Sequence, residues 1–232
     1  MKRLVEIASK PIGLAQADEV AEGANDLRGL LGQKNGFYAF ESALHVFPSG
    51  APRVPGYSLQ EWNAPDLWLA SYGRLAPAAL FFAEDLFGCQ FALVDHAVYS
   101  FNPETAQLTH FSDDLDEWEQ NLLARYNHAT GYSVGHEWQL ANGALLPGHR
   151  LVPRIPFVGG GDYSADNMVP VESAAALRYW GNFANKVANL EDGAQLHFSP
   201  ADIDSLKCAK WSGVGPAECR CFERSKPASI ER

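Results

Sequence analysis

Four short apolar runs in the middle of the chain constrain its fold more than any other feature. They are rich in Phe, Val, Leu and Tyr, which is typical of β-strands, and they cover residues 79–82, 91–94, 98–101 and 107–111. Turn sequences separate them, among them Phe87-Gly88 and Asn102-Pro103. Parallel strands need crossover connections of about a dozen residues or more, which links of this kind do not supply. The runs therefore predict an antiparallel β-meander.

Helical periodicity surrounds these strands. Apolar residues recurring every three or four positions predict helices at residues 17–31, 115–126 and from 172 onward, with further helices expected at roughly 59–72 and 132–141. Asp114 and Glu117 have the spacing of a capping box at the start of the 115–126 helix. Tryptophans occupy core-like helical positions at Trp62, Trp68, Trp118 and Trp180. Stretches rich in Gly and Pro predict loops at 48–56 and 142–170, and a further strand is expected at 194–198. These elements predict the α+β class, with a single antiparallel β-sheet meander packed with helices.

Charge divides the chain into two parts. The formal net charge is −10, from 28 acidic and 18 basic residues. Residues 75–124 contain nine acids and no Lys or Arg, whereas residues 207–232 carry six bases and three acids, a net charge of +3. We therefore expect an α+β domain over residues 1–200 and a basic, cysteine-containing tail over 201–232. The acidic balance argues against direct binding of nucleic acid, which needs a basic patch, and is compatible with a basic protein partner.

The densest acidic segment, residues 113–119, has two interpretations. It is either a solvated helix N-terminus, where acids are stabilised by the helix dipole, or part of a face that attracts a basic partner. Carboxylates also suit Ca²⁺, but the spacing of a calcium-binding loop is absent, so no metal site is predicted. The candidate partner-binding residues are Glu84, Asp85, Asp95, Asp113, Asp114, Asp116, Glu117 and Asp162.

Three segments resemble a known family. They read FFAEDLFGCQF at 81–91, FSDDLDEW at 111–118, and PFVGGGDY at 156–163 followed by Asp166-Asn167-Met168. Their order and spacing resemble the SUKH superfamily, which includes fungal cell-wall synthesis regulators and bacterial toxin-immunity proteins. The resemblance covers about residues 20–198 and leaves out the cysteine-bearing tail. It implies a SUKH-like α+β fold and a binding role, since bacterial members neutralise toxins, often nucleases, by binding them. It supplies no shared catalytic residues.

The motifs of a phosphate loop and of a zinc peptidase are both incomplete. The Gly159–Ser164 segment lacks the glycine spacing and the lysine of a phosphate loop, and therefore predicts a tight turn with positive φ. His136-Glu137 does not extend to a zinc-peptidase motif because the second histidine position is Leu140. Ser, His and Asp residues are present, so a catalytic triad whose members meet only in the fold stays possible. No cofactor is predicted.

The cysteines leave three alternatives open. Cys208, Cys219 and Cys221 lie in the tail, and with His197 they form a potential zinc site, a redox or disulfide pair, or a group with no role. Together with Cys89 they do not have the spacing of a disulfide framework, which suits a reducing cytosol. An apolar run of about 18 residues and a signal-peptide pattern are both absent, so we expect a cytoplasmic protein without a membrane span.

Three hypotheses for function follow. The first is a non-enzymatic protein-binding module, namely a bacterial immunity protein that neutralises a toxin domain, such as a nuclease, through an acidic surface. The second is an intracellular scaffold or regulator of cell-wall-related processes. The third is an uncharacterised hydrolase, which predicts a pocket containing a titratable group with a strongly perturbed pKa.

Overall fold

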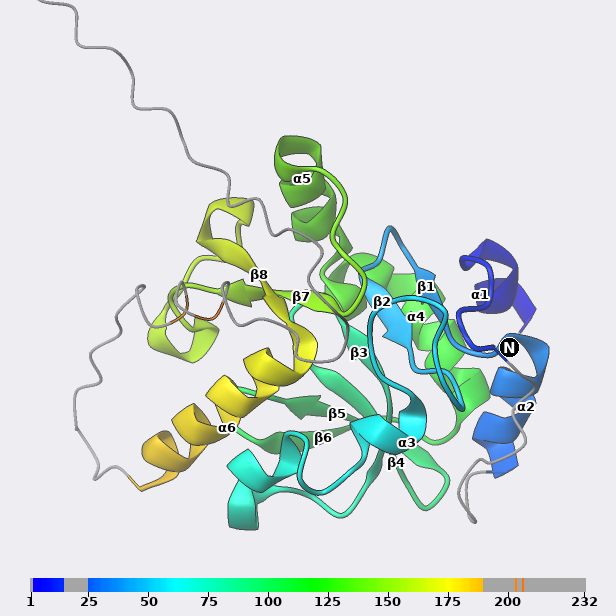
Figure 1. The fold of residues 1–232 in the computed structure, drawn as a ribbon, viewed down its shortest axis with the longest axis horizontal. Coiled ribbons are helices and arrows are strands. Elements are labelled where there is room, and N and C mark those ends of the chain that lie inside the picture. Colours follow the sequence, from blue (N-terminus) through cyan, green and yellow to red (C-terminus); the bar gives the residue numbers. More distant parts are fainter. Residues whose placement is uncertain (1, 15–24, 190–202, 204–205, 207–232) are drawn as a thin grey trace, which may run out of the picture.

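The computed structural model describes residues 2–14, 25–189, 203 and 206 (Figure 1). Its main sheet has six strands in the order β1-β2-β3-β4-β5-β6, with every neighbouring pair antiparallel. The strands are β1 (Phe37–Ala39), β2 (Leu44–Val46), β3 (Leu80–Asp85), β4 (Gln90–Val94), β5 (Ala97–Asn102) and β6 (Gln107–Ser112). The predicted α+β class and antiparallel meander are confirmed, and β1 and β2 extend the meander toward the N-terminus.

A second, two-stranded sheet lies where the sequence predicts a loop. β7 (His149–Pro153) pairs antiparallel with β8 (Met168–Glu172), inside the Gly- and Pro-rich stretch 142–170. Prolines normally exclude a segment from a sheet because they cannot donate a ladder hydrogen bond. Here the sheet has only two strands, so each strand pairs along one edge and has no ladder hydrogen bonds along the other. Pro153 and Pro170 are tolerated in such edge strands.

Three of the predicted helices form in full, the one predicted at 59–72 does not, and the one predicted at 17–31 is described only in its second half, which is helical. The helices are α1 (Lys2–Ile7), α2 (Asn25–Gln33), α3 (Leu59–Trp62), α4 (Leu115–Thr130), α5 (Tyr132–Asn142) and α6 (Ser173–Ala188), with short 3-10 turns η1 (Leu69–Ser71), η2 (Gly73–Leu75), η3 (Phe157–Gly159) and η4 (Ala165–Asn167). Of the predicted helix 17–31, residues 17–24 lie outside the described residues. The predicted strand 194–198 does so too.

The expected helix over 59–72 is wrong, because α3 ends at Trp62. Pro65 disfavours helical geometry at the residue before it. The side chain of Asn63 then ties the end of α3 to strand β3. Its Nδ2 donates to the carbonyls of Leu59 and Phe81, both at 2.8 Å, and its Oδ1 accepts from the Phe81 amide at 2.9 Å. The rest of the segment forms η1 and η2.

Aromatic side chains fill both faces of the main sheet. On one face, the ring of Trp118 in α4 packs against Phe82 and Phe91, with centroids 5.1 and 5.6 Å away. On the other face, Trp68 packs against Phe81 at 4.9 Å. The adjacent residues Phe81 and Phe82 thus serve opposite faces, as expected for successive strand positions. The four predicted core tryptophans, Trp62, Trp68, Trp118 and Trp180, are all buried.

A smaller hydrophobic cluster covers one end of the sheet. It joins Leu86 and Phe87, in the β3–β4 turn, to Trp138 in α5 and Leu151 in β7. We call this end, with the β3–β4 and β5–β6 turns, the covered end. Figure 1 shows α5, β7 and β8 gathered on this side of the molecule, with α6 leading away from β8.

Two residues beyond the expected domain boundary belong to the folded body. Ile203 is fully buried in the main core, and Leu206 packs against that core. The domain therefore extends past residue 200. Residues 207–232, with the three tail cysteines, and His197 lie outside the described residues.

Candidate functional site

The structure brings five of the eight candidate acids to one end of the main sheet. Val94 pairs with Ala97, and Val98 pairs with Ser112, so the β4–β5 turn and the β6–α4 junction lie side by side, opposite the covered end. All five acids are exposed there, and we call them the acidic end: Asp95, Asp113, Asp114, Asp116 and Glu117.

Helix capping fixes part of the acidic end. Asp114 is the N-cap of α4, and its carboxylate accepts a hydrogen bond from the Glu117 amide at 2.7 Å, as predicted. The Glu117 carboxylate in turn accepts a hydrogen bond from the amide of Asp113, at 2.8 Å, rather than from the amide of Asp114. His110 Nε2 lies 3.0 Å from the Asp113 carboxylate. These contacts hold three carboxylates, those of Asp113, Asp114 and Glu117, in defined positions without burying them. They also show that the acids stabilise the helix terminus.

Glu84 is not a surface residue, which corrects its assignment as a partner-binding residue. Its side chain is only 1 % exposed, and Arg150, itself fully buried, places Nε 2.8 Å from Glu84 Oε1. The same oxygen accepts from His45 Nδ1 at 3.0 Å and from Ser173 Oγ at 3.2 Å. The group is an internal network that joins β2, β3, β7 and α6.

Electrostatics keep Glu84 ionised inside this network. Burial alone raises its pKa, but the charge of Arg150 and the hydrogen bond from His45 outweigh burial and hold the pKa at about 2. Burial lowers the pKa of His45. Since a carboxylate only accepts, His45 donates from Nδ1. Members of this network are scattered along the sequence, so no spacing signal predicts it.

Asp85 is also internal, at 7 % exposure, and is likewise corrected. Its Oδ1 accepts from the amides of Phe87, at 2.9 Å, and Cys89, at 2.8 Å, which closes the β3–β4 turn. Burial raises its pKa to about 7, although those two amide hydrogen bonds oppose the shift. Successive strand residues normally face opposite sides. Glu84 and Asp85 are both enclosed because α5 and the β7–β8 sheet pack over this end.

Asp162 is exposed but belongs to the β7–β8 connection, away from the acidic end. That connection lies at the covered end, where the carboxylate of Glu104 in the β5–β6 turn accepts from the amides of Phe157 and Val158, at 3.1 and 2.9 Å. Asp162 therefore does not join the other acids.

The segment that carries the PFVGGGDY resemblance forms a braced loop. Gly160 has φ +83°, which confirms the predicted turn. A Cβ at Gly161 would lie 1.9 Å from the Ile155 carbonyl oxygen, so this position requires glycine. The Asn167 amide group donates to the carbonyls of Ile155, at 3.0 Å, and Asp162, at 2.9 Å. The rings of Phe157 and Tyr163 pack against Phe87.

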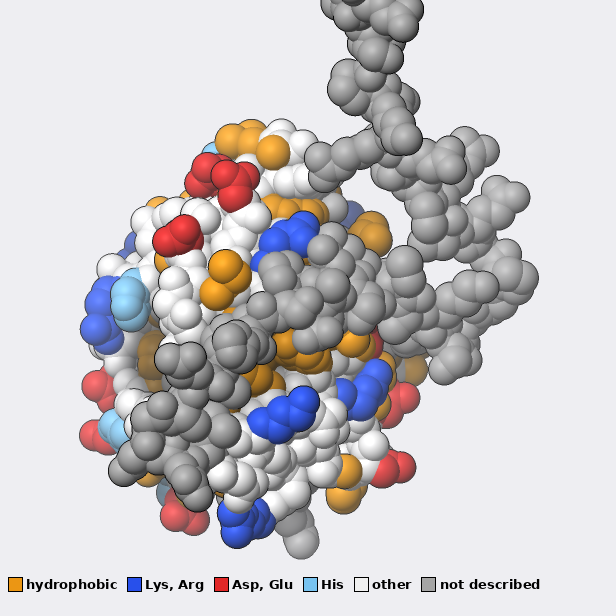
Figure 2. All heavy atoms as spheres, turned by 90° about the vertical axis from the view of Figure 1, so that its left-hand side faces the viewer, with side chains coloured by type: hydrophobic (Ala, Val, Ile, Leu, Met, Phe, Trp, Pro, Cys, Tyr) orange, Lys and Arg blue, Asp and Glu red, His pale blue; other side chains and the backbone are white. Residues whose placement is uncertain are grey.

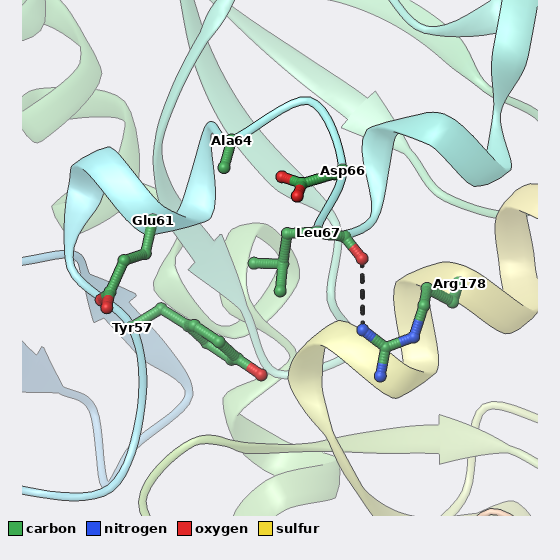
Figure 3. A pocket seen from close by; sticks show the side chains of 6 residues that line it. All are labelled: Tyr57, Glu61, Ala64, Asp66, Leu67 and Arg178. Carbon is green, nitrogen blue, oxygen red and sulfur yellow. Dashed lines mark hydrogen bonds between the residues drawn. The ribbon is translucent and has the colours of Figure 1, made fainter. Parts of the chain in front are cut away.

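A separate surface hollow lies between α3 and α6 (Figure 3). Its volume is about 350 Å³, and its lining residues are Tyr57, Glu61, Ala64, Asp66, Leu67 and Arg178. Arg178 donates to the Leu67 carbonyl at 3.2 Å, and Glu61 is engaged in the capping box of α3. Glu84 and Asp85, the acids with strongly shifted pKa values, are not among the lining residues.

The part of the chain that the structure describes contains no group of three or more His, Cys, Asp or Glu side chains positioned to hold a metal ion. None of its helices combines the length and apolar character needed to cross a membrane.

Charges of both signs mix on another face of the molecule. Figure 2 shows the side that carries α6, where basic and acidic side chains are interspersed around apolar ones.

Comparison with known proteins yields one distant structural similarity and no family assignment. No protein family and no curated protein matches the chain. Among solved structures, the crystal structure of Atu4351 from Agrobacterium tumefaciens has a TM-score of 0.45 and 12 % sequence identity, over 77 % of this chain and 86 % of that one. A similarity this distant carries no argument about function.

Proposed function

We propose that this chain is a protein-binding module that docks a basic partner on its acidic end. The observation that carries the proposal is the meeting of two segments, the β4–β5 turn and the β6–α4 junction, in one group of five exposed carboxylates. The stretch of sequence that supplies them, residues 75–124, has no Lys or Arg of its own.

Exposed charges of this kind mainly affect the rate at which two proteins associate. Complementary potentials raise association rates and disfavour wrong partners, while each exposed pair adds little affinity. The carboxylates of Asp114 and Glu117 are already held by hydrogen bonds before binding. These side chains therefore lose less conformational entropy when a partner binds. Screening by salt weakens such steering, because the Debye length is only about 8 Å at physiological ionic strength.

The resemblance to the SUKH superfamily supports the finer form of the proposal. In that form the partner is a toxin domain with a basic substrate cleft, for example a nuclease, and the acidic end occupies the cleft. Neutralisation then needs no chemistry from this chain, because the bound protein excludes the substrate.

The test is a tagged purification from the source cells with two variants of equal charge. The first neutralises the acidic end: D113N, D114N, D116N and E117Q, in which Asn and Gln keep the capping hydrogen bonds. The control neutralises four exposed acids elsewhere: D66N, E137Q, D162N and D166N.

The proposal expects one basic protein in stoichiometric amount, lost as salt rises, retained by the control variant and lost by the acidic-end variant. Equal capture by both variants contradicts it. Several weakly held partners, captured alike by both, favour a regulator or scaffold instead.

A further inference from the structure

A row of four rings lies at the far end of α4 from the acidic end. Phe40 stacks on Tyr126 with centroids 5.3 Å apart, Tyr126 contacts Tyr132 at 5.3 Å, and Tyr132 stacks on His136 at 5.7 Å. The row joins the β1–β2 loop to α4 and α5. Tyr126 is 37 % exposed, and the His136 side chain is 45 % exposed, so the row reaches the surface.

Unusual backbone geometry occurs in two segments that carry this row, the β1–β2 loop and helix α4. Three consecutive residues of the β1–β2 loop, Phe40, Glu41 and Ser42, have φ of 52, 51 and 70° although none is glycine. Left-handed geometry costs a non-glycine residue roughly 1–2 kcal/mol. On the other side, α4 is kinked at Arg125, one residue before Tyr126. Strain of this kind persists where the surroundings enforce it, and it often marks functional sites.

Buried and surface contacts hold the strained loop. The buried Arg150 donates from Nη1 to the Ser42 carbonyl at 2.8 Å, and Gln139 of α5 donates to the Glu41 carbonyl at 2.9 Å. The internal network around Glu84 therefore reaches the surface through Arg150 and fixes the loop that carries Phe40 and Glu41.

The Glu41 carboxylate completes the arrangement. It is half exposed, its Oε2 lies 2.8 Å from His136 Nδ1, and its Oε1 lies 3.4 Å from the Tyr132 hydroxyl. A carboxylate oxygen has two acceptor positions, so each oxygen keeps one for an incoming donor. An exposed carboxylate beside aromatic rings is an environment that attracts a cation.

We propose that the aromatic row and Glu41 bind an arginine side chain of the partner. A guanidinium group is planar, stacks on aromatic rings and pairs with both oxygens of a carboxylate, whereas an ammonium group does only part of this. This inference rests on the proposed function, because it places a second contact for the same basic partner.

The two sites fit one interface. Asp114 and Tyr126 are twelve residues apart on α4, which corresponds to about 18 Å at a rise of 1.5 Å per residue. A typical interface covers about 800 Å² on each partner, enough to span that distance. Buried arginines and aromatic residues dominate binding energy at interface centres, so the row would anchor a partner that the acidic end attracts.

A titration with a small probe tests the row without a partner protein. The full chain, labelled for NMR, is titrated at 0.15 M salt with the peptide Ac-Gly-Arg-Gly-NH₂ and with its citrulline counterpart, which has the same shape and no charge. We expect the arginine peptide to shift resonances of Tyr126, Tyr132 and His136 with a millimolar Kd. The citrulline peptide should bind at least fivefold more weakly.

Variants separate the contributions of ring and carboxylate. Glu41→Gln and Tyr126→Ala should each weaken arginine-peptide binding at least threefold. Tyr126→Phe should leave it unchanged, and so should Asp66→Asn, which neutralises an exposed acid beside α3 and outside the row. Equal shifts from both peptides, or unchanged binding in Glu41→Gln, would overturn the inference. Glu41→Gln preserves the hydrogen-bonding shape, so it answers the question even where Tyr126→Ala perturbs folding.

The outcome is independent of the acidic end. At 0.15 M salt, about 18 Å is more than two Debye lengths, so the four-acid variant should bind the arginine peptide like the wild type. Peptide binding without a captured basic partner supports the row and contradicts the proposed function. A captured partner combined with no preference for arginine over citrulline supports the proposed function and contradicts the row.

Discussion

Arg150 places its Nε 2.8 Å from the Glu84 carboxylate in a position where both side chains are enclosed by the protein. Arg150 also reaches the Ser42 carbonyl of the β1–β2 loop, while among the described residues its Nη2 has no hydrogen-bond partner. The pair thus connects the interior of the sheet to the strained loop at the surface. It is an expensive arrangement, because two charges have been removed from water.

Removing one partner of this pair should destabilise the fold strongly. Arg150→Met leaves the Glu84 charge buried with only neutral partners, and such losses typically amount to about 3–5 kcal/mol. The double variant E84L/R150M removes both charges and should recover part of the loss. Urea denaturation measures both variants, and a loss below about 1 kcal/mol in Arg150→Met would contradict this account of the network.

Asp85 should make stability fall with rising pH. Its folded-state pKa is about 7, against an ordinary value of 3.8, so the folded chain holds the proton more tightly than the unfolded chain. Its contribution is therefore fully present below about pH 4 and is lost as the pH rises through about 7.

Asp85→Asn tests this directly, because the amide oxygen still accepts from Phe87 and Cys89 without a titrating charge. Urea midpoints measured from pH 4 to 8 should decline more steeply in the wild type than in Asp85→Asn. Parallel curves would show that Asp85 titrates normally in the fold.

Gly161 should be irreplaceable in the braced loop. Gly161→Ala brings a Cβ against the Ile155 carbonyl oxygen, and backbone on both sides must shift to relieve it. We expect a loss of about 1–3 kcal/mol. Gly29→Ala in α2, where no atom lies within 4 Å of the new Cβ, serves as the matched control and should stabilise the chain by roughly 0.5–1 kcal/mol. Equal thermal midpoints for the two variants would contradict the expected clash.

Two substitutions of Asp114 should distinguish its role in stabilising α4 from its role in binding a partner. Asp114→Ala removes the N-cap of α4 and should cost about 1 kcal/mol, whereas Asp114→Asn keeps a capping oxygen and should be nearly neutral for stability. Both substitutions remove the charge, so both should slow association with a basic partner. Thermal unfolding and partner-binding kinetics, compared across the two variants, check the distinction.

The sequence predicts the meander and α4 well because their signals are local. Strand runs alternate with turns between residues 79 and 111, and the Asp114 carboxylate caps α4 by accepting from the amide of Glu117, only three residues later. The interruption of the helix after Trp62 has a local signal in Pro65, which the apolar periodicity of 59–72 hides. The hydrogen bonds between Asn63 and Phe81 that fix the chain there are set by the tertiary fold.

The candidate site is predicted only in part for the same reason. Counting charge finds the five acids of the acidic end. It does not distinguish them from Glu84 and Asp85, whose burial depends on α5 and the β7–β8 sheet, elements that come much later in the chain. The aromatic row is built from residues near 40 and near 130, and only the folded chain places them together.

The central claim, binding of a basic partner at the acidic end, is tested most directly by association rates. The rate constant for a captured partner should fall steeply with ionic strength in the wild type. In the variant carrying D113N, D114N, D116N and E117Q it should be lower at low salt and nearly independent of salt, while the dissociation rate changes little. Identical salt dependence in both proteins would contradict the claim.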